Sequence, residues 1–300
     1  MGPANSIGVV GLGLVGMALA RRLAAAGFEV TGFDLREEAR AALAGHGGRP
    51  ATSLAEIAGA ASCVVLAVFD TRDVLSVVEG PDGLLSVPGV RCIIDCSTGT
   101  PSELEALAGR LKTRGIAFVE APLSGSSQQI AAGEATLLLG GESASLQQCE
   151  AVLAAMAGKR LHVGGAGMGA KAKLATNLVL GLNRAALAEG MVFAESLGIA
   201  PEQFLALVLA SPATSGAAQA KGRMMVDGDF APQSRIRQHL KDLSLMIESA
   251  AAAGQELPLS ETHAALLRAA IAAGDGELDN AAIIRELRRR KTAPPSHRPD

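Results

Sequence analysis

The chain has 300 residues, of which 49% are hydrophobic and 19% charged, and its formal net charge is −3. This length is typical of about two domains, and the apolar share excludes an extended disordered protein. There is no Trp, no Tyr and only seven Phe, which argues against a stacking platform for single-stranded nucleic acid, and the acidic balance argues against general DNA binding. No apolar run reaches the length of a membrane span. We therefore expect neither a nucleic-acid partner nor a membrane partner.

Short apolar runs alternate with helical patterns over the first half of the chain. Runs bounded by Gly, Asp or Pro predict strands, at 6–10, 29–33, 63–68, 91–95, 116–119, 135–139 and 160–163. Helical periodicity and start signals predict helices between them, at 15–26, 37–44, 53–59, 71–78, 101–113 and 143–156. This alternation predicts βαβ units and an α/β fold with a doubly wound, mostly parallel sheet.

The second part of the chain has helical patterns without a convincing strand. The predicted helices lie at 171–197, 201–209, 215–226, 236–253, 258–273 and 280–289. We therefore predict an α/β domain over residues 1–164 and an all-helical domain over residues 165–290, entered through the long helix. The basic run 288–291 leads into a tail, 291–300, that we expect to be disordered.

The cysteines and histidines show no ligand spacing. Cys63, Cys92 and Cys96 lie in strand-like runs, where a free cysteine is usually a small buried hydrophobic residue. Such cysteines fit a reducing cytoplasm, which is the location we expect. The five histidines form no cluster, so we predict no metal site.

A glycine-rich turn follows the first predicted strand. Gly11, Gly13 and Gly16 have the spacing G-x-G-x-x-G between a strand and a helix, and Asp34 closes the next strand. Gly11 permits the tight turn, Gly13 lets the backbone approach a pyrophosphate, and Gly16 allows close helix packing. This context predicts a Rossmann domain that binds a dinucleotide at the helix N-terminus, rather than a turn kept for packing alone. The predicted cofactor contacts of the turn are Gly11, Leu12, Gly13, Leu14, Val15 and Gly16.

The end of the second strand bears on the choice of cofactor. Asp34 favours NAD, because a carboxylate accepts hydrogen bonds from ribose hydroxyls and repels a 2′-phosphate. Arg36 leaves NADP open, because a nearby arginine accommodates that phosphate. We assign Asp34, Leu35 and Arg36 to the cofactor site.

Three later segments complete a pattern. They read DCSTGTP at 95–101, EAPLSGS at 120–126 and GAGMGAKAKLATN at 165–177. Together with the glycine turn they resemble the β-hydroxyacid dehydrogenase family, whose members include 3-hydroxyisobutyrate dehydrogenase and tartronate semialdehyde reductase. The resemblance extends over residues 6 to 290. It implies hydride exchange between NAD(P) and the alcohol carbon of a small 3-hydroxy acid or the matching semialdehyde, and a homodimer or homotetramer.

The resemblance implies that Lys173 is the catalytic acid and base and that Asn177 assists it. Positions i and i+4 share one face of a helix, so both side chains can point at one substrate oxygen. A lysine in a partly desolvated cleft has a lowered pKa, which suits proton exchange. The alternative is a surface lysine on an amphipathic helix.

The resemblance also assigns the substrate carboxylate to Ser124 and Gly125. A hydroxyl and backbone N–H groups are suitable donors to an anion, although a serine here could also simply form the turn. Ser126 stands where the family usually has glycine and adds a polar group near the expected pocket. This departure leaves the identity of the substrate open.

Four further residues match the family. Val68, Phe69 and Thr98 follow the carboxyl ends of predicted strands, where α/β sheets bind ligands, and match loops beside the nicotinamide. Lys241 matches a family lysine that reaches the active site, and we assign it to both the substrate site and the cofactor site. Asp242 is expected to orient Lys241. The alternative is that Lys241 is a lysine on the helix surface.

Two other functions stay open. One is an imine reductase-like NADPH enzyme, a class that usually lacks the catalytic lysine. The other is a dinucleotide-binding module without turnover, whose members tend to lose that lysine. The presence of Lys173 and Asn177 favours the dehydrogenase over both.

Overall fold

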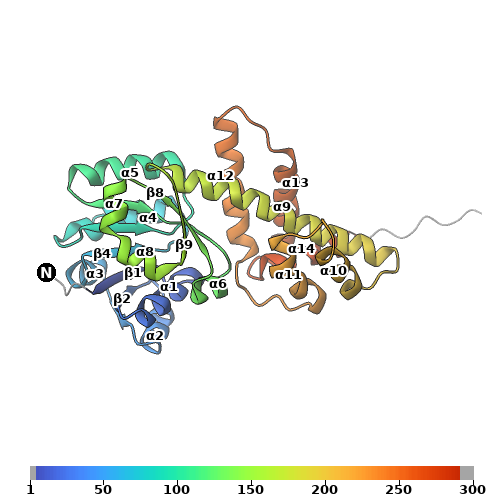
Figure 1. Cartoon of the computed structure of the whole chain (residues 1–300), viewed down its shortest axis with the longest axis horizontal. Coiled ribbons are helices and arrows are strands. Elements are labelled where there is room, and N and C mark those ends of the chain that lie inside the picture. The colour runs from blue at the N-terminus through green and yellow to red at the C-terminus, as the bar shows by residue number, and fades with distance from the viewer. Residues whose placement is uncertain (1–4, 291–300) are drawn as a thin grey trace, which may run out of the picture. The chain divides into compact units, whose positions relative to one another are not determined.

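The computed structural model describes residues 5–290 and divides into two compact units, Met1–Ala175 and Thr176–Asp300 (Figure 1). The domain boundary predicted at residue 164 stays a prediction. The tail 291–300 and its expected disorder lie outside the described residues. None of the helices in the described part of the chain combines the length and the apolar character needed to cross a membrane.

Unit 1 is built on a nine-stranded sheet in the order β3-β2-β1-β4-β5-β6-β8-β7, with β9 paired to β8. The strands are β1 (Ser6–Val10), β2 (Glu29–Phe33), β3 (Arg49–Pro50), β4 (Cys63–Leu66), β5 (Cys92–Asp95), β6 (Ala117–Glu120), β7 (Leu123–Ser124), β8 (Thr136–Gly140) and β9 (Lys159–Gly164). The pairs from β3 through β6 are parallel, whereas β8 runs antiparallel to β6 and β7. The predicted mostly parallel sheet is therefore confirmed.

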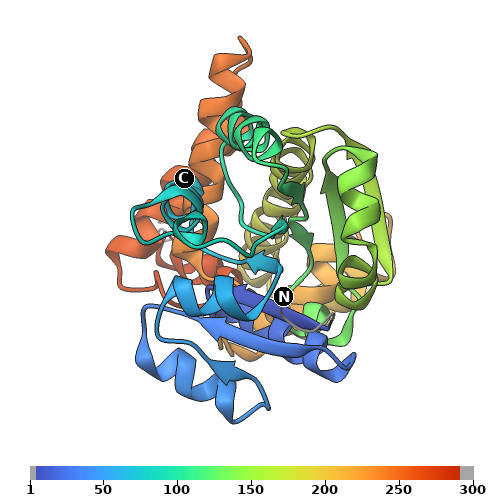
Figure 2. The ribbon, with the colours of Figure 1, turned by 90° about the vertical axis from the view of Figure 1, so that its left-hand side faces the viewer.

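Helices cover both faces of the sheet (Figures 1 and 2). They are α1 (Leu14–Ala25), α2 (Glu37–Ala44), α3 (Leu54–Ala60), α4 (Thr71–Glu79), α5 (Pro101–Thr113), α6 (Ser127–Ala132), α7 (Ser143–Gln148) and α8 (Glu150–Met156), with a 3-10 turn η1 (Leu84–Ser86). Alternate strand residues face opposite sides: Val65 belongs to the same buried cluster as Leu19 of α1, and Val64 to the same cluster as Ile57 of α3. Burying such a side chain contributes about 1.5–3 kcal/mol, so both layers hold the sheet. This is the doubly wound arrangement that the alternation predicts.

Several details differ from the sequence prediction. The strands β3 and β7 and the helix α6 are too short to show a periodicity. The helix predicted over 143–156 is two helices, because Cys149 has ψ 0° between them. All four cysteines are free and buried, which confirms their apolar role.

The regular structure in the described part of unit 2 is helical, apart from one isolated bridge between Arg235 and Asp279. Its helices are α10 (Pro201–Leu209), α11 (Gly216–Asp227), α12 (Ile236–Ala252), α13 (Pro258–Ala272), the 3-10 turn η2 (Asn280–Ala282) and α14 (Ile283–Arg289). The 29-residue helix α9 (Met168–Ser196) begins in unit 1 and continues into unit 2. The predicted all-helical character is confirmed.

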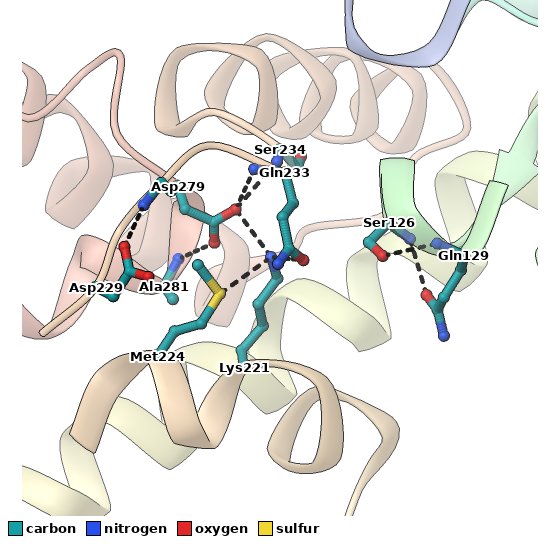
Figure 3. Close-up of polar contacts among 10 residues, drawn as sticks. Ser126, Gln129, Lys221, Met224, Asp229, Gln233, Ser234, Asp279 and Ala281 are labelled. Carbon is teal, nitrogen blue, oxygen red and sulfur yellow. Dashed lines mark hydrogen bonds and ion pairs between the residues drawn. The ribbon is translucent and has the colours of Figure 1, made fainter. Parts of the chain in front are cut away.

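A buried carboxylate organises the interior of unit 2 (Figure 3). Asp279 is fully buried, and its Oδ2 accepts from the Lys221 ammonium at 2.8 Å and from the backbone N–H groups of Gln233 and Ser234 at 2.9 and 3.1 Å. Its Oδ1 accepts from the Ala281 N–H at 3.0 Å. Burial lowers the pKa of Lys221, and the carboxylate partly offsets this. Asp279 thus joins α11, the segment before α12 and η2.

Candidate functional site

The glycine turn has the backbone that a bound pyrophosphate needs. Gly11 has φ +86°, and a Cβ there would lie 2.4 Å from the Ala67 carbonyl oxygen. A Cβ on Gly16 would lie 1.8 Å from the Gly11 carbonyl oxygen. A Cβ on Gly13 would meet no atom within 4 Å, so this position opens into space. The first and third glycines are therefore required by packing, and the second leaves room for a ligand.

The start of α1 faces this open position without a side-chain cap. Gly13 is the N-cap residue with extended backbone, and no side chain accepts from the first turn, which holds no acidic residue. The first N–H groups of a helix lack intrahelical partners and attract anions. The N–H groups of Leu14 and Val15 are thus suited to hold a dinucleotide pyrophosphate.

Asp34 is held in place directly after β2. Its Oδ2 accepts from the Leu12 N–H at 2.8 Å and its Oδ1 from the Arg36 N–H at 2.9 Å, while the Arg36 guanidinium contacts both oxygens at 3.1 Å. Burial alone would raise the pKa of Asp34, but the hydrogen bonds from Arg36 and Leu12 outweigh it and lower that pKa. Leu35 beside it is 88% exposed. An ionised carboxylate fixed to the glycine turn fits a ribose diol.

The loops after β4 and β5 are joined by a polar chain. The Val68 N–H donates to Ser97 Oγ at 3.1 Å, and the Ser97 N–H donates to Asp95 Oδ1 at 2.9 Å. Phe69 is 42% exposed, and Thr98 is half-buried. The three residues predicted to line the nicotinamide therefore follow two adjacent parallel strands at the carboxyl edge of the sheet.

The structure brings Lys173 to the segment that carries Ser124 and Gly125. The Lys173 ammonium donates to the Leu123 carbonyl at 2.6 Å across 50 residues of sequence. Ser124 and Lys173 are both half-buried, and Gly125 is exposed with φ +154°. The Lys173 ammonium therefore binds the residue directly before Ser124 and Gly125 in unit 1.

Ser126 is engaged in a capping box at the start of α6 (Figure 3). Its N–H donates to Gln129 Oε1 at 2.8 Å, and its Oγ accepts from the Gln129 N–H at 3.3 Å. The backbone N–H of Ser126 is therefore already bound within the chain. Its assignment to the substrate stays a prediction.

A carboxylate to which the sequence analysis assigns no role, the first residue of the motif EAPLSGS, lies next to this segment. Glu120 ends β6 and is 1% exposed, and it accepts from the Gly167 N–H at 2.5 Å and the Ala170 N–H at 3.0 Å. Burial raises the pKa of Glu120 to about 7, and the Asp95 carboxylate adds to the rise, whereas the N–H groups oppose it.

The helical unit holds the other two predicted side chains on one carboxylate. The Asn177 amide nitrogen donates to Asp242 Oδ2 at 3.2 Å, and the Lys241 ammonium contacts Asp242 Oδ1 at 2.8 Å. Asp242 is 5% exposed. It therefore contacts Lys241, as the sequence leads us to expect, and it also fixes Asn177.

A Rossmann unit with an open glycine turn and a fixed acid, followed by a helical unit, is typical of NAD(P)-dependent oxidoreductases. Family models agree: the NAD binding domain of 6-phosphogluconate dehydrogenase matches residues 6–165, and NAD-binding of NADP-dependent 3-hydroxyisobutyrate dehydrogenase matches residues 167–287. The chain belongs to the β-hydroxyacid dehydrogenase family.

Individual relatives are similar over nearly the whole chain. L-threonate dehydrogenase of Cupriavidus necator is 33% identical over 284 residues, which are 94% of this chain and 95% of that protein. A crystal structure of 3-hydroxyisobutyrate dehydrogenase from Salmonella typhimurium has a TM-score of 0.85 at 30% identity and covers 93% of this chain and 99% of its own. An imine reductase from Pseudomonas sp. has a TM-score of 0.63 at 25% identity and covers 94% and 99%. The prediction of a hydroxyacid dehydrogenase that uses NAD(P) is confirmed.

Proposed function

We propose that this dehydrogenase uses Lys173 to exchange a proton with the alcohol oxygen of a small 3-hydroxy acid or the matching semialdehyde. The observation that carries the proposal is the 2.6 Å hydrogen bond from the Lys173 ammonium to the Leu123 carbonyl, directly before Ser124 and Gly125. A carbonyl oxygen fixes the amine by a dipole and leaves it able to gain or lose a proton. Geometry of this kind suits a general acid and base.

The chain's residues divide the reaction between them. When bound, the nicotinamide would accept the hydride in oxidation and donate it in reduction. During oxidation the neutral amine of Lys173 takes the hydroxyl proton while the carbon loses a hydride, and during reduction it returns that proton. Asn177 and Lys241 keep the substrate roles that the resemblance implies, and their shared contact with Asp242 supports a fixed orientation of each.

The substrate class follows from the anion donors. The Ser124 hydroxyl and the Gly125 N–H suit a carboxylate. Two similar proteins, named for L-threonate and 3-hydroxyisobutyrate, act on small carboxylates that bear a hydroxyl. Because the Ser126 N–H is bound to Gln129, we expect the carboxylate to be held by the Ser124 hydroxyl and the Gly125 N–H rather than by the backbone of Ser126.

The cofactor preference, the assembly and the location belong to the same proposal. The fixed Asp34 carboxylate supports NAD over NADP. Large apolar side chains of α9 and α10 support a homodimer or homotetramer, since Phe193 is 62% and Leu207 60% exposed. A monomeric mass by light scattering would count against the assembly. The cytoplasm is the compartment that fits four free, buried cysteines.

The test compares two lysines of one helix. Lys173→Ala is expected to lower kcat with 3-hydroxy acids by about 10²- to 10⁴-fold, the range of general acid–base catalysis, while NADH affinity measured by fluorescence changes less than about twofold. Lys171→Ala is the matched control, because Lys171 is exposed and lies about 160° around the helix. Turnover by Lys173→Ala at the wild-type rate would refute the proposal, and retained reduction of cyclic imines with NADPH would favour an imine reductase. NADH binding without any turnover by the wild type would favour the non-catalytic module.

A further inference from the structure

The last residue of β6 is a buried carboxylate with no part in the proposed chemistry. Glu120 uses both oxygens: Oε2 accepts from the Gly167 N–H at 2.5 Å and Oε1 from the Ala170 N–H at 3.0 Å. These N–H groups belong to the beginning of α9, where a helix has donors without intrahelical partners. Glu120 therefore caps the helix that carries Lys173.

The surroundings admit the carboxylate only because two neighbours are glycines. A Cβ on Gly169 of α9 would lie 2.8 Å from the Glu120 Cβ. A Cβ on Gly140 of β8 would lie 2.6 Å from Glu120 Oε2 and 2.5 Å from the Gly169 nitrogen. Any larger residue at either position would push the start of α9 away from the sheet. The contact is therefore a close docking of the first helical turn on β6 and β8.

Two contacts join the same two segments. Glu120 holds the backbone of residues 167–170, and the Leu123 carbonyl, three residues after Glu120, accepts from Lys173, three residues after Ala170. A helix rises about 1.5 Å per residue. A shift of α9 by even that distance would break the 2.6 Å hydrogen bond of Lys173 and move its amine away from Ser124.

We propose that Glu120 is a positioning residue for Lys173: by binding the first N–H groups of α9, it sets the position of the amine, along the helix axis, beside the segment Leu123–Gly125. This inference rests on the role proposed for Lys173. An error of about 1 Å in the placement of a reacting group can lower a rate about 10²-fold. Glu120 touches neither substrate nor cofactor in this scheme and acts only through the helix.

The charge on Glu120 supplies a readout that a merely structural residue would lack. An ionised carboxylate accepts from both N–H groups, whereas a protonated one offers a donor in place of one acceptor. Burial raises the pKa of Glu120 to about 7, so this change falls in the neutral range. The charged groups nearest to it in the described residues are Asp95, its partner on β5, and Glu105 of α5 beside Gly167, while Gly140 of β8 contributes no side chain.

The experiment measures kcat, KM and NADH affinity for Glu120→Gln and Glu120→Asp. We expect Glu120→Gln to lower kcat about 10- to 100-fold with KM and NADH affinity within about threefold, and Glu120→Asp to restore part of kcat. The ratio of wild-type to Glu120→Gln kcat should fall as the pH drops from 8 to 6, since wild-type Glu120 then becomes protonated. Val152→Ala, at a buried position of α8 in the core, is the control for lost stability alone.

Three results would overturn the inference: an unchanged kcat in Glu120→Gln, a kcat ratio constant with pH, or an equal loss in Val152→Ala. If Glu120→Gln does not fold, Gly169→Ala tests the same point, because it displaces the carboxylate without removing it. Lys173→Ala separates the two claims. If that variant keeps its turnover, the proposed function fails. If it loses turnover while Glu120→Gln keeps the wild-type kcat, only the positioning role fails.

Discussion

Acid should destabilise the helical unit through one buried histidine. His263 of α13 is 2% exposed, its ring centroid lies 5.1 Å from that of His239, and among residues 5–290 neither of its ring nitrogens has a hydrogen-bond partner. Burial lowers the pKa of His263 to about 4, and the nearby charge of Arg184 adds to this. Arg184 is itself buried, which lowers its pKa only to about 10, so it stays charged. The folded unit therefore holds a neutral imidazole beside a permanent cation.

The size of the effect follows from proton linkage. An unfolded histidine takes up its proton near pH 6.5, whereas the folded one does so near pH 4, so the unfolded state binds more protons in this interval. The contribution of His263 to stability is complete above pH 6.5 and is lost as the pH falls to 4. About 2.5 pH units at about 1.4 kcal/mol each give a loss of about 3 kcal/mol. This is a large share of the 5–15 kcal/mol typical of a domain.

Urea unfolding followed by circular dichroism at pH 7.5 and pH 5 measures this loss. We compare the wild type with His263→Phe, which keeps a buried ring but cannot take up a proton, and with His46→Gln at an exposed position. Contributions from all other groups are common to the three proteins. The free energy of unfolding should fall by about 2 kcal/mol more in the wild type and in His46→Gln than in His263→Phe. An equal pH dependence in His263→Phe would refute the argument.

Three further predictions concern single carboxylates. Asp279→Ala should lower the free energy of unfolding by about 3–5 kcal/mol in urea titrations, because it leaves Lys221 buried without its counter-ion; a loss below about 1 kcal/mol would contradict this. Asp34→Ala should shift the ratio of NADPH to NADH affinity at least about tenfold towards NADPH in fluorescence titrations, since it removes a charge that repels the 2′-phosphate and releases Arg36; an unchanged ratio would count against NAD preference. Because the pKa of Glu120 is raised, the contribution of this residue to stability is complete below pH 4.5 and declines by about 3 kcal/mol as the pH rises to 7. The free energy of unfolding of Glu120→Gln, measured in urea, should therefore decline less over this interval than that of the wild type.

Elements with strong local signals were predictable to the residue. The helices α5 and α10 extend over Pro101–Thr113 and Pro201–Leu209, the bounds expected from sequence, because a proline in the first turn marks each start. The glycine turn was equally predictable, since its three glycines and Asp34 act within one βαβ unit. The predicted strand 63–68 ends two residues early at Leu66, where the chain turns away into the loop that carries Val68.

Short elements and their side chains were harder to predict. The helix α6 has six residues, fewer than two helical turns, so its periodicity cannot be read. A local signal did exist, because Ser126 followed three residues later by Gln129 is a capping-box pattern. It predicts that Ser126 bonds within its own helix start, as the structure shows, and it weakens the case for a substrate contact at that residue.

Glu120 shows why residues that act through contacts distant in sequence are difficult to predict. It lies 47 residues from Gly167 in the sequence, and no local pattern predicts which carboxylate of the chain binds which backbone N–H groups. The sequence nevertheless states that some acceptor is needed: residues 164–170 read GGAGMGA and hold no Ser, Thr, Asp or Asn that could cap the start of α9. Because the first donors of a buried helix end must be satisfied, a long helix without a local cap predicts a distant one. A motif acid at the end of a parallel strand, beside the segment that the helix must reach, is the side chain to examine first.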